Sequence, residues 1–178
     1  MSKMFQFKVS LIASDPLIWR RVLVPQTFTF DNLHKVIQQL FQWEESHLHE
    51  FGIGDTYPRK KINGRLPLAD FFERAKQSCT YTYDFGDNWE HAVVFERWTE
   101  RPDAPTIPVC IAGEQNAPPE DCGGVPGYYG LLEAIADPAH PEHETFSEWL
   151  GGPFDPTQFD MAAINAQLKR IKGKGKRP

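Results

Sequence analysis

Apolar and polar side chains alternate in several short segments of the first hundred residues, and this period of two limits the possible folds most. Residues 5–11 alternate throughout, as in a β-strand with one buried face. Strand-like composition recurs in four more segments: residues 18–24, 47–53, 78–85 and 89–98. Turn residues, Gly86-Asp-Asn88, separate the last two segments. The pattern therefore predicts two antiparallel hairpins.

One helix is predicted between the two hairpins. Apolar residues recur there at i, i+3, i+4, i+7 and i+8, and so share one helical face: Leu33, Val36, Ile37, Leu40 and Phe41. Thr29 is placed to cap this helix, and Asp31 lies in its first turn, where negative charge is favourable. We expect the apolar face to pack against the sheet.

Proline and glycine interrupt two longer stretches. Residues 54–68 have the composition of a connection between elements. Residues 99–127 contain several prolines, which exclude a long helix, so we predict a long ordered loop there. Ordered loops of this length often carry function.

Three helices are expected in the last third of the chain. The first spans residues 128–136, and a short second one lies between Pro141 and Gly151. The third begins at Asp155-Pro-Thr-Gln158, which resembles a capping box with proline in the first position. It is expected to bury four apolar residues: Phe159, Ile164, Leu168 and Ile171.

Length and composition favour a single domain. The chain has 178 residues, 40% hydrophobic and 24% charged, which are ordinary values for one globular core. We predict an α+β fold over residues 1–171, in which a mostly antiparallel sheet packs around a central helix before a helical C-terminal third. Residues 172–178 are expected to form a disordered basic tail.

The charge distribution argues against a nucleic-acid-binding body. The net charge is −5 although the tail is basic, so the remainder is more acidic still. Duplex binding needs a basic surface that releases counterions from phosphates. We therefore expect nucleic acid to bind, as an alternative hypothesis, only through the basic stretch 169–177.

The cysteines and the N-terminus predict a cytoplasmic protein. The three cysteines form no Cys-x-x-Cys motif, and the first residues lack the apolar core of a signal peptide. No apolar run approaches the roughly 20 residues of a membrane-spanning helix. We expect no membrane association.

Histidines and cysteines suggest two candidate metal sites. His47 and His49 would share one face of a strand, an arrangement that can chelate one metal ion. A mixed zinc site could combine Cys110 and Cys122 with His47, His49 or His91 if the long loop folded back on the sheet. The alternatives are partly buried histidines with local hydrogen bonds, and buried cysteines that pack as small apolar residues.

Acidic and aromatic residues gather at the turn of the second hairpin. Asp84, Asp87, Glu90 and His91 could supply an acid, a base or metal ligands, and Trp89 adds an aromatic surface. Turn chemistry explains the same residues differently, because Asp and Asn bond to nearby backbone groups in turns. His91 would then belong to a packed face.

A second candidate cluster lies in the long loop. Glu120 and Asp121 could bind a cation, and Cys122 could act as a nucleophile if a base lowered the pKa of its thiol. Alternatively, the two acids pair with Arg20, Arg21 or backbone amides.

Several of these segments resemble the plasmid pRiA4b ORF-3-like family. They occur in order: Ile18-Trp-Arg-Arg-Val22, Leu33-His34, His47-Leu-His-Glu-Phe51, Tyr81-Thr-Tyr-Asp-Phe-Gly-Asp-Asn-Trp-Glu-His91, Pro118-Pro-Glu-Asp-Cys-Gly-Gly124 and Gly127-Tyr128. The resemblance implies a roll-like α+β domain encoded on plasmids, mobile elements or chromosomes, and implies no established activity. Family members often carry cysteine where this chain has Ala117, which weakens the expectation of a cysteine-rich metal site.

The sequence supports two functional hypotheses. The first is a non-catalytic binding or accessory domain for an unidentified protein or small molecule. Its candidate ligand-binding residues lie in the hairpin turn and the long loop: Asp84, Asp87, Trp89, His91, Glu120, Asp121 and Tyr128. The alternative is a hydrolase or nuclease that uses a divalent metal held by residues from the His/Asp cluster: His47, His49, Asp84, Asp87 and His91.

Overall fold

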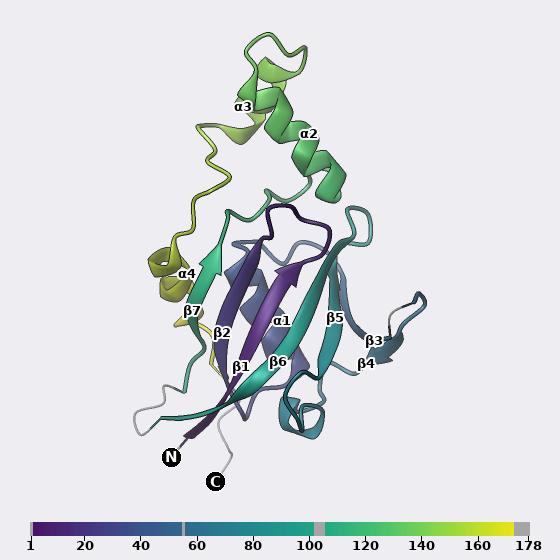
Figure 1. Ribbon diagram of the computed structural model, residues 1–178, viewed down its shortest axis with the longest axis vertical. Helices are drawn as coiled ribbons and strands as arrows, with labels where there is room; N and C mark the ends of the chain where they lie inside the picture. Colours follow the sequence, from purple (N-terminus) through teal and green to yellow (C-terminus); the bar gives the residue numbers. More distant parts are fainter. Residues whose placement is uncertain (1, 55, 102–105, 173–178) are drawn as a thin grey trace.

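A computed structural model describes residues 2–54, 56–101 and 106–172 (Figure 1). In this part of the chain, seven strands form one antiparallel sheet in the order β4-β3-β5-β6-β1-β2-β7. The strands are β1 (Ser2–Leu11), β2 (Trp19–Pro25), β3 (His49–Ile53), β4 (Lys60–Ile62), β5 (Ser78–Tyr83), β6 (Trp89–Arg101) and β7 (Val109–Glu114). The helices are α1 (Phe30–Leu40), the short 3₁₀ helix η1 (Leu68–Asp70), α2 (Gly124–Ala136), α3 (His143–Leu150) and α4 (Met161–Leu168). The α+β class and both predicted hairpins, β1–β2 and β5–β6, are confirmed.

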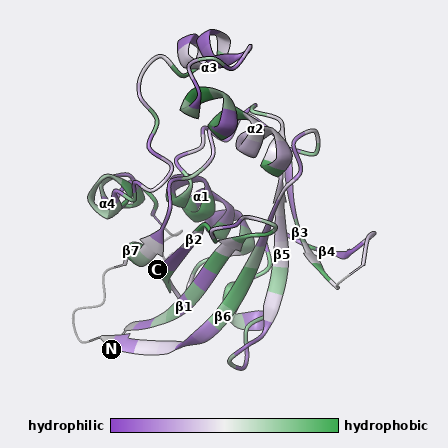
Figure 2. Cartoon of the chain, turned by 45° about the horizontal axis from the view of Figure 1, so that its top comes forward, coloured by the Kyte–Doolittle hydropathy of each residue, from purple (hydrophilic) through white to green (hydrophobic). Residues whose placement is uncertain are grey.

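Helix α1 and one face of the sheet form the core. The apolar stripe of α1 is fully buried, and Phe5 and Phe7 of β1 point into the same core. The alternation of hydrophobic and hydrophilic residues along β1 and β6 is visible in Figure 2. Thr29 caps α1 as predicted, because its side chain accepts a hydrogen bond from the backbone amide of Asn32.

A buried arginine ties the end of α1 to the sheet. The guanidinium of Arg20 donates hydrogen bonds to the backbone carbonyls of Leu40, Trp19 and Glu114. Burial lowers the pKa of Arg20 to about 10, so the side chain keeps its charge at neutral pH. These contacts fix the segment that leaves α1 and enters the candidate site.

The predicted long loop contains a strand, so that prediction is wrong in part. Strand β7 pairs with β2 at one end of the sheet. Its other edge is covered by the side chain of Asn165, which exchanges two hydrogen bonds of 2.8 and 2.9 Å with the backbone of Cys110. A residue of α4 therefore stabilises β7, and this long-range contact leaves no local pattern in the sequence. The predicted connection 54–68 likewise contains the three-residue strand β4.

Three other boundaries differ from the predictions. Helix α2 begins at Gly124 rather than at residue 128. Helix α4 is capped by Asp160, whose carboxylate accepts a hydrogen bond from Ala163, whereas Asp155 forms a local turn with Thr157. Strand β3 begins at His49, which leaves His47 in the preceding connection. Most of the predicted basic tail, residues 173–178, lies outside the described residues.

The helices after β7 occupy two places around the sheet (Figure 1). Helix α4 lies beside β7 and α1, while α2 and α3 pack together beyond one end of the sheet. In the part of the chain described here, none of the helices has the length and apolar character needed to cross a membrane.

Candidate functional site

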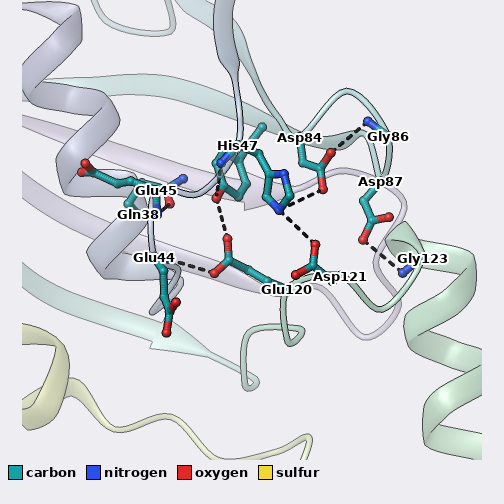
Figure 3. Close-up of polar contacts among 11 residues, drawn as sticks. Gln38, Glu44, Glu45, His47, Asp84, Gly86, Asp87, Glu120, Asp121 and Gly123 are labelled. Carbon is teal, nitrogen blue, oxygen red and sulfur yellow. Dashed lines mark hydrogen bonds and ion pairs between the residues drawn. The ribbon is translucent and has the colours of Figure 1, made fainter. Parts of the chain in front are cut away.

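Three segments that are distant in sequence meet at the end of the sheet that faces α2 (Figure 3). They are residues 41–48 after α1, the turn 84–88 between β5 and β6, and the loop 115–123 between β7 and α2. Each contributes acidic side chains, and the first also contributes His47.

The turn 84–88 holds Asp84 in one orientation. Asp84 has a φ of 56°, in the left-handed region, and its backbone amide donates to the carbonyl of Leu48. Its Oδ1 accepts a hydrogen bond of 2.9 Å from the amide of Gly86. The side chain is only 12% exposed, and its Oδ2 faces the imidazole of His47 (Figure 3). The turn chemistry predicted from the sequence therefore also orients a carboxylate.

Glu120 fixes the loop 115–123 onto the other two segments. Its carboxylate accepts hydrogen bonds from the hydroxyl of Tyr83, at 2.5 Å, and from the amide of Glu44, at 2.9 Å. The indole of Trp43 adds a hydrogen bond to the carbonyl of Pro118. Burial and the bond to Glu120 raise the pKa of Tyr83, so its hydroxyl remains a donor at neutral pH.

A second contact joins the turn to the start of α2. The carboxylate of Asp87 accepts a hydrogen bond of 3.0 Å from the amide of Gly123. Gly124 has a φ of 70° and lies directly against the backbone carbonyl of Asp87, where a Cβ atom would overlap the carbonyl oxygen. Gly123 and Gly124 thus allow a close approach between two backbones.

His47 lies between two carboxylates that come from different segments. Its Nε2 is 2.9 Å from Oδ1 of Asp121 and 3.7 Å from Oδ2 of Asp84. One ligand atom from each of the three residues lies within 4.8 Å of the other two. The His47 side chain is 32% exposed and that of Asp121 66% exposed, so solvent reaches the cluster from one side. These groups can bind a metal ion or another cation.

The carboxylates of the site have no arginine or lysine partner among the described residues. The arginines predicted as partners are used elsewhere, because Arg20 bonds to carbonyls and Arg21 forms an ion pair with Glu96. The predicted pairing of the two loop acids with backbone amides is found at Glu120, whereas Asp121 lies beside His47. Asp87 also accepts a hydrogen bond from a backbone amide, that of Gly123. Asp84 and Asp121 flank the imidazole of His47, whereas Asp87 binds the amide of Gly123 and Glu120 binds Tyr83 and Glu44 (Figure 3).

A cleft of about 480 Å³ adjoins this cluster. Acidic residues line one part of it and apolar residues another: Glu44, Glu120 and Asp121, and Trp43, Leu150 and Phe154. Clefts of this volume suit small ligands, with few polar groups fixing the orientation.

Three of the predicted site residues do not join the cluster: Trp89 and His91 lie in the core, and His49 is half-buried. Trp89 and His91 are fully buried, and His91 packs edge-on against Phe41 with its Nδ1 on the carbonyl of Trp89. Burial lowers the pKa of His91 to about 3. His49 stacks on His34 at 3.5 Å, so it does not join His47 in a chelate. The two histidines diverge because β3 begins only at His49, whereas His47 lies in the preceding connection.

The cysteines do not gather with the histidines in the described part of the chain. Cys110 is buried in β7 beside α4, and Cys122 lies in the loop near Asp87. Burial, reinforced by the charge of Asp87, raises the pKa of Cys122 to about 12, which disfavours a thiolate nucleophile. Tyr128 is buried in α2 against Phe154, at one side of the cleft.

Two residues that build the site were not predicted. The hydroxyl of Tyr83 donates a hydrogen bond to Glu120, and Glu44 lines the cleft. Tyr83 belongs to the family-like segment 81–91, but it alternates with Tyr81 along β5, which predicts a core position rather than a site residue. For Glu44, the only indication in the sequence of a place in the site is its position just after the apolar stripe of α1.

The chain is similar to a protein family, to a further protein and to a solved structure. The sequence matches the family described as plasmid pRiA4b ORF-3-like protein over residues 3–163. It is 36% identical over 176 residues to the uncharacterized protein y4hQ of Sinorhizobium fredii (strain NBRC 101917 / NGR234), covering 93% of this chain and 88% of that protein. The crystal structure of MM3350 from Methanosarcina mazei Go1, a protein of unknown function, is similar with a TM-score of 0.81. That likeness has 38% sequence identity and covers 91% of this chain and 97% of the other.

Proposed function

The chain belongs to the plasmid pRiA4b ORF-3-like family, and we propose that it is a non-catalytic binding or accessory domain. The relatives y4hQ and MM3350 have no named activity. The ligand surface of this chain is the acidic cluster around His47 together with the adjoining cleft. The ligand is positively charged, either a metal ion or an organic cation.

One observation carries this proposal. Carboxylates from two segments converge on an imidazole from a third, without an arginine or lysine partner among the described residues, and the side chain of Asp84 is almost buried. Carboxylates held close together in a poorly solvated place repel one another, and a bound cation relieves that repulsion. His47 alone can offset one of these charges, and only when it is protonated.

The metal-dependent hydrolase or nuclease is not favoured. Protein y4hQ is described as uncharacterized and MM3350 as a protein of unknown function, so neither relative supports an enzymatic activity. Of the residues proposed for it, His91 is buried in the core and His49 is stacked on His34, so neither faces the cluster. A binding role needs only the groups that do converge.

Several broader properties complete the proposal. The three cysteines are free thiols, which is consistent with a reducing cytoplasm. A single roll-like domain over residues 1–171 would present the cleft at the end of its sheet. A protein partner could bring the cation as a lysine or arginine side chain, and the basic tail could contact phosphates independently of this site.

Thermal unfolding in the presence of cationic probes tests the proposal. We expect one of three probes, spermidine, a lysine-rich peptide or a divalent ion, to raise Tm by roughly 5–10 °C at a hundredfold excess over its dissociation constant. The double variant Glu44→Gln/Asp121→Asn should lose this shift, because it removes two exposed carboxylates of the site.

A charge-matched variant supplies the control. Glu133→Gln/Glu144→Gln changes the net charge equally, at exposed positions of α2 and α3. It should keep the full shift. The proposal is wrong if no probe stabilises the protein, or if both double variants lose the shift to the same extent.

A further inference from the structure

We propose that His47, Asp84 and Asp121 form a site for one divalent transition-metal ion of the zinc class. This inference rests on the proposed binding function and names the cation for the same site. The ligand atoms are Nε2 of His47, Oδ2 of Asp84 and Oδ1 of Asp121.

The spacing of the three atoms fits a metal ion. Zinc binds histidine nitrogen and carboxylate oxygen at roughly 2.0–2.2 Å, so tetrahedral neighbours lie roughly 3.4 Å apart. The distances from Nε2 of His47 to the two carboxylates, 2.9 and 3.7 Å, lie on either side of that value.

The hydrogen bonding of His47 independently points to a ligand. Its Nε2 atom is inaccessible to solvent and has no hydrogen-bond partner of acceptable geometry, although it lies between two carboxylates. A buried polar atom without a partner is unfavourable, and a metal ion at this position would satisfy it. The imidazole ring is held in place against Tyr83, at 5.7 Å between ring centroids.

The surroundings orient two of the three ligands in advance. The amide of Gly86 binds Oδ1 of Asp84, which leaves Oδ2 for the ion. Glu120, next to Asp121, fastens the loop to Tyr83 and Glu44. Hydrogen bonds of this kind fix ligand orientation at metal sites. Three protein ligands leave at least one coordination position open to solvent or to a partner's group.

The type of ligand favours zinc-class ions over the alkaline-earth ions. Calcium and magnesium prefer sites made of oxygen atoms alone, whereas imidazole favours zinc, cobalt and nickel. The cluster offers one nitrogen and two oxygens, so we expect Zn²⁺ and Co²⁺ to bind and Mg²⁺ to compete poorly.

Calorimetric titration of untagged, chelator-treated protein with Zn²⁺ and Co²⁺ tests the inference. We expect one equivalent of either ion to bind. His47→Gln and Asp121→Asn should each weaken binding at least about tenfold, with far-UV circular dichroism unchanged. Cobalt in a tetrahedral nitrogen and oxygen site should also give visible absorption that both variants lose.

Two controls keep the outcome interpretable. His140→Gln and Glu133→Gln alter one imidazole and one carboxylate away from the site and should bind like the unmodified protein. The metal site is refuted if neither ion binds, or if His47→Gln and Asp121→Asn bind as tightly as these controls. Stabilisation by spermidine or the peptide without metal binding would refute the metal site alone and leave the proposed binding function standing.

Discussion

Lowering the pH from 6.5 to 4.5 is expected to reduce the free energy of unfolding by about 2.3 kcal/mol for each of two buried histidines, His34 and His91. Burial lowers the pKa of each to about 3, from an ordinary value of 6.5. Between pH 6.5 and 3, the two histidines therefore bind protons in the unfolded chain but stay neutral in the folded protein. The full stability is present above pH 6.5 and is lost as the pH falls toward 3.

Urea unfolding at pH 6.5, 5.5 and 4.5 measures this loss. His91→Gln removes one of the two groups, so the acid-induced loss should become smaller by about 1.4 kcal/mol per pH unit, whatever the variant's stability at neutral pH. Val93→Ala, a buried residue of the same strand that does not titrate, should lower stability equally at every pH. Equal pH slopes for His91→Gln and the unmodified protein would contradict the assignment.

Gly124→Ala is expected to lower the free energy of unfolding by about 2–4 kcal/mol. Gly124 has a φ of 70°, which strains any residue with a side chain, and the new Cβ would overlap the backbone carbonyl of Asp87. The turn and the start of α2 would have to separate, which would also move Gly123 away from the carboxylate of Asp87. Urea unfolding at neutral pH measures the change.

Gly130→Ala is the matched comparison for this prediction. Gly130 lies in the same helix, and no atom lies within 4 Å of the position of its Cβ. Alanine should therefore stabilise α2 there, by up to about 1 kcal/mol. If Gly124→Ala were as stable as Gly130→Ala, the close contact between the turn and α2 would be absent.

The sequence predicts the fold well where one pattern acts over several residues. The alternation of residues 5–11 and the apolar stripe 33–41 predict β1 and α1, because burial of one face determines both elements. Strand β7 could not be predicted in this way. It follows Pro108, contains a bulge near Ile111 and depends on Asn165, which lies 55 residues away from Cys110.

Helix starts were harder to predict than helix interiors. Both Asp155 and Asp160 have the right side chain for an N-cap, and only the packing of α4 against β7 decides between them. Gly124 and Pro126 weaken the helical pattern at the start of α2, although proline is well tolerated in a first turn.

The sequence predicts the residues of the candidate site but only part of their grouping. It places Asp84 with Asp121 in one hypothesis and His47 with Asp84 in the other, but it also pairs His47 with His49 because it predicts one strand that includes both histidines. The grouping depends on where the loop 115–123 folds back, and Glu120 determines that through Tyr83 and Glu44. Such contacts join residues up to 76 positions apart and leave no periodic signal.

Nuclear magnetic resonance of ¹⁵N-labelled protein, titrated separately with Zn²⁺ and with spermidine, tests the binding site most directly. We predict that the amide signals that shift belong to residues 44–48, 84–88 and 120–123 together, while those of α4 stay unchanged. Shifts in all three segments at one common midpoint would show a single site. Absence of shifts with both probes, or shifts confined to other parts of the sheet and α4, would contradict the account.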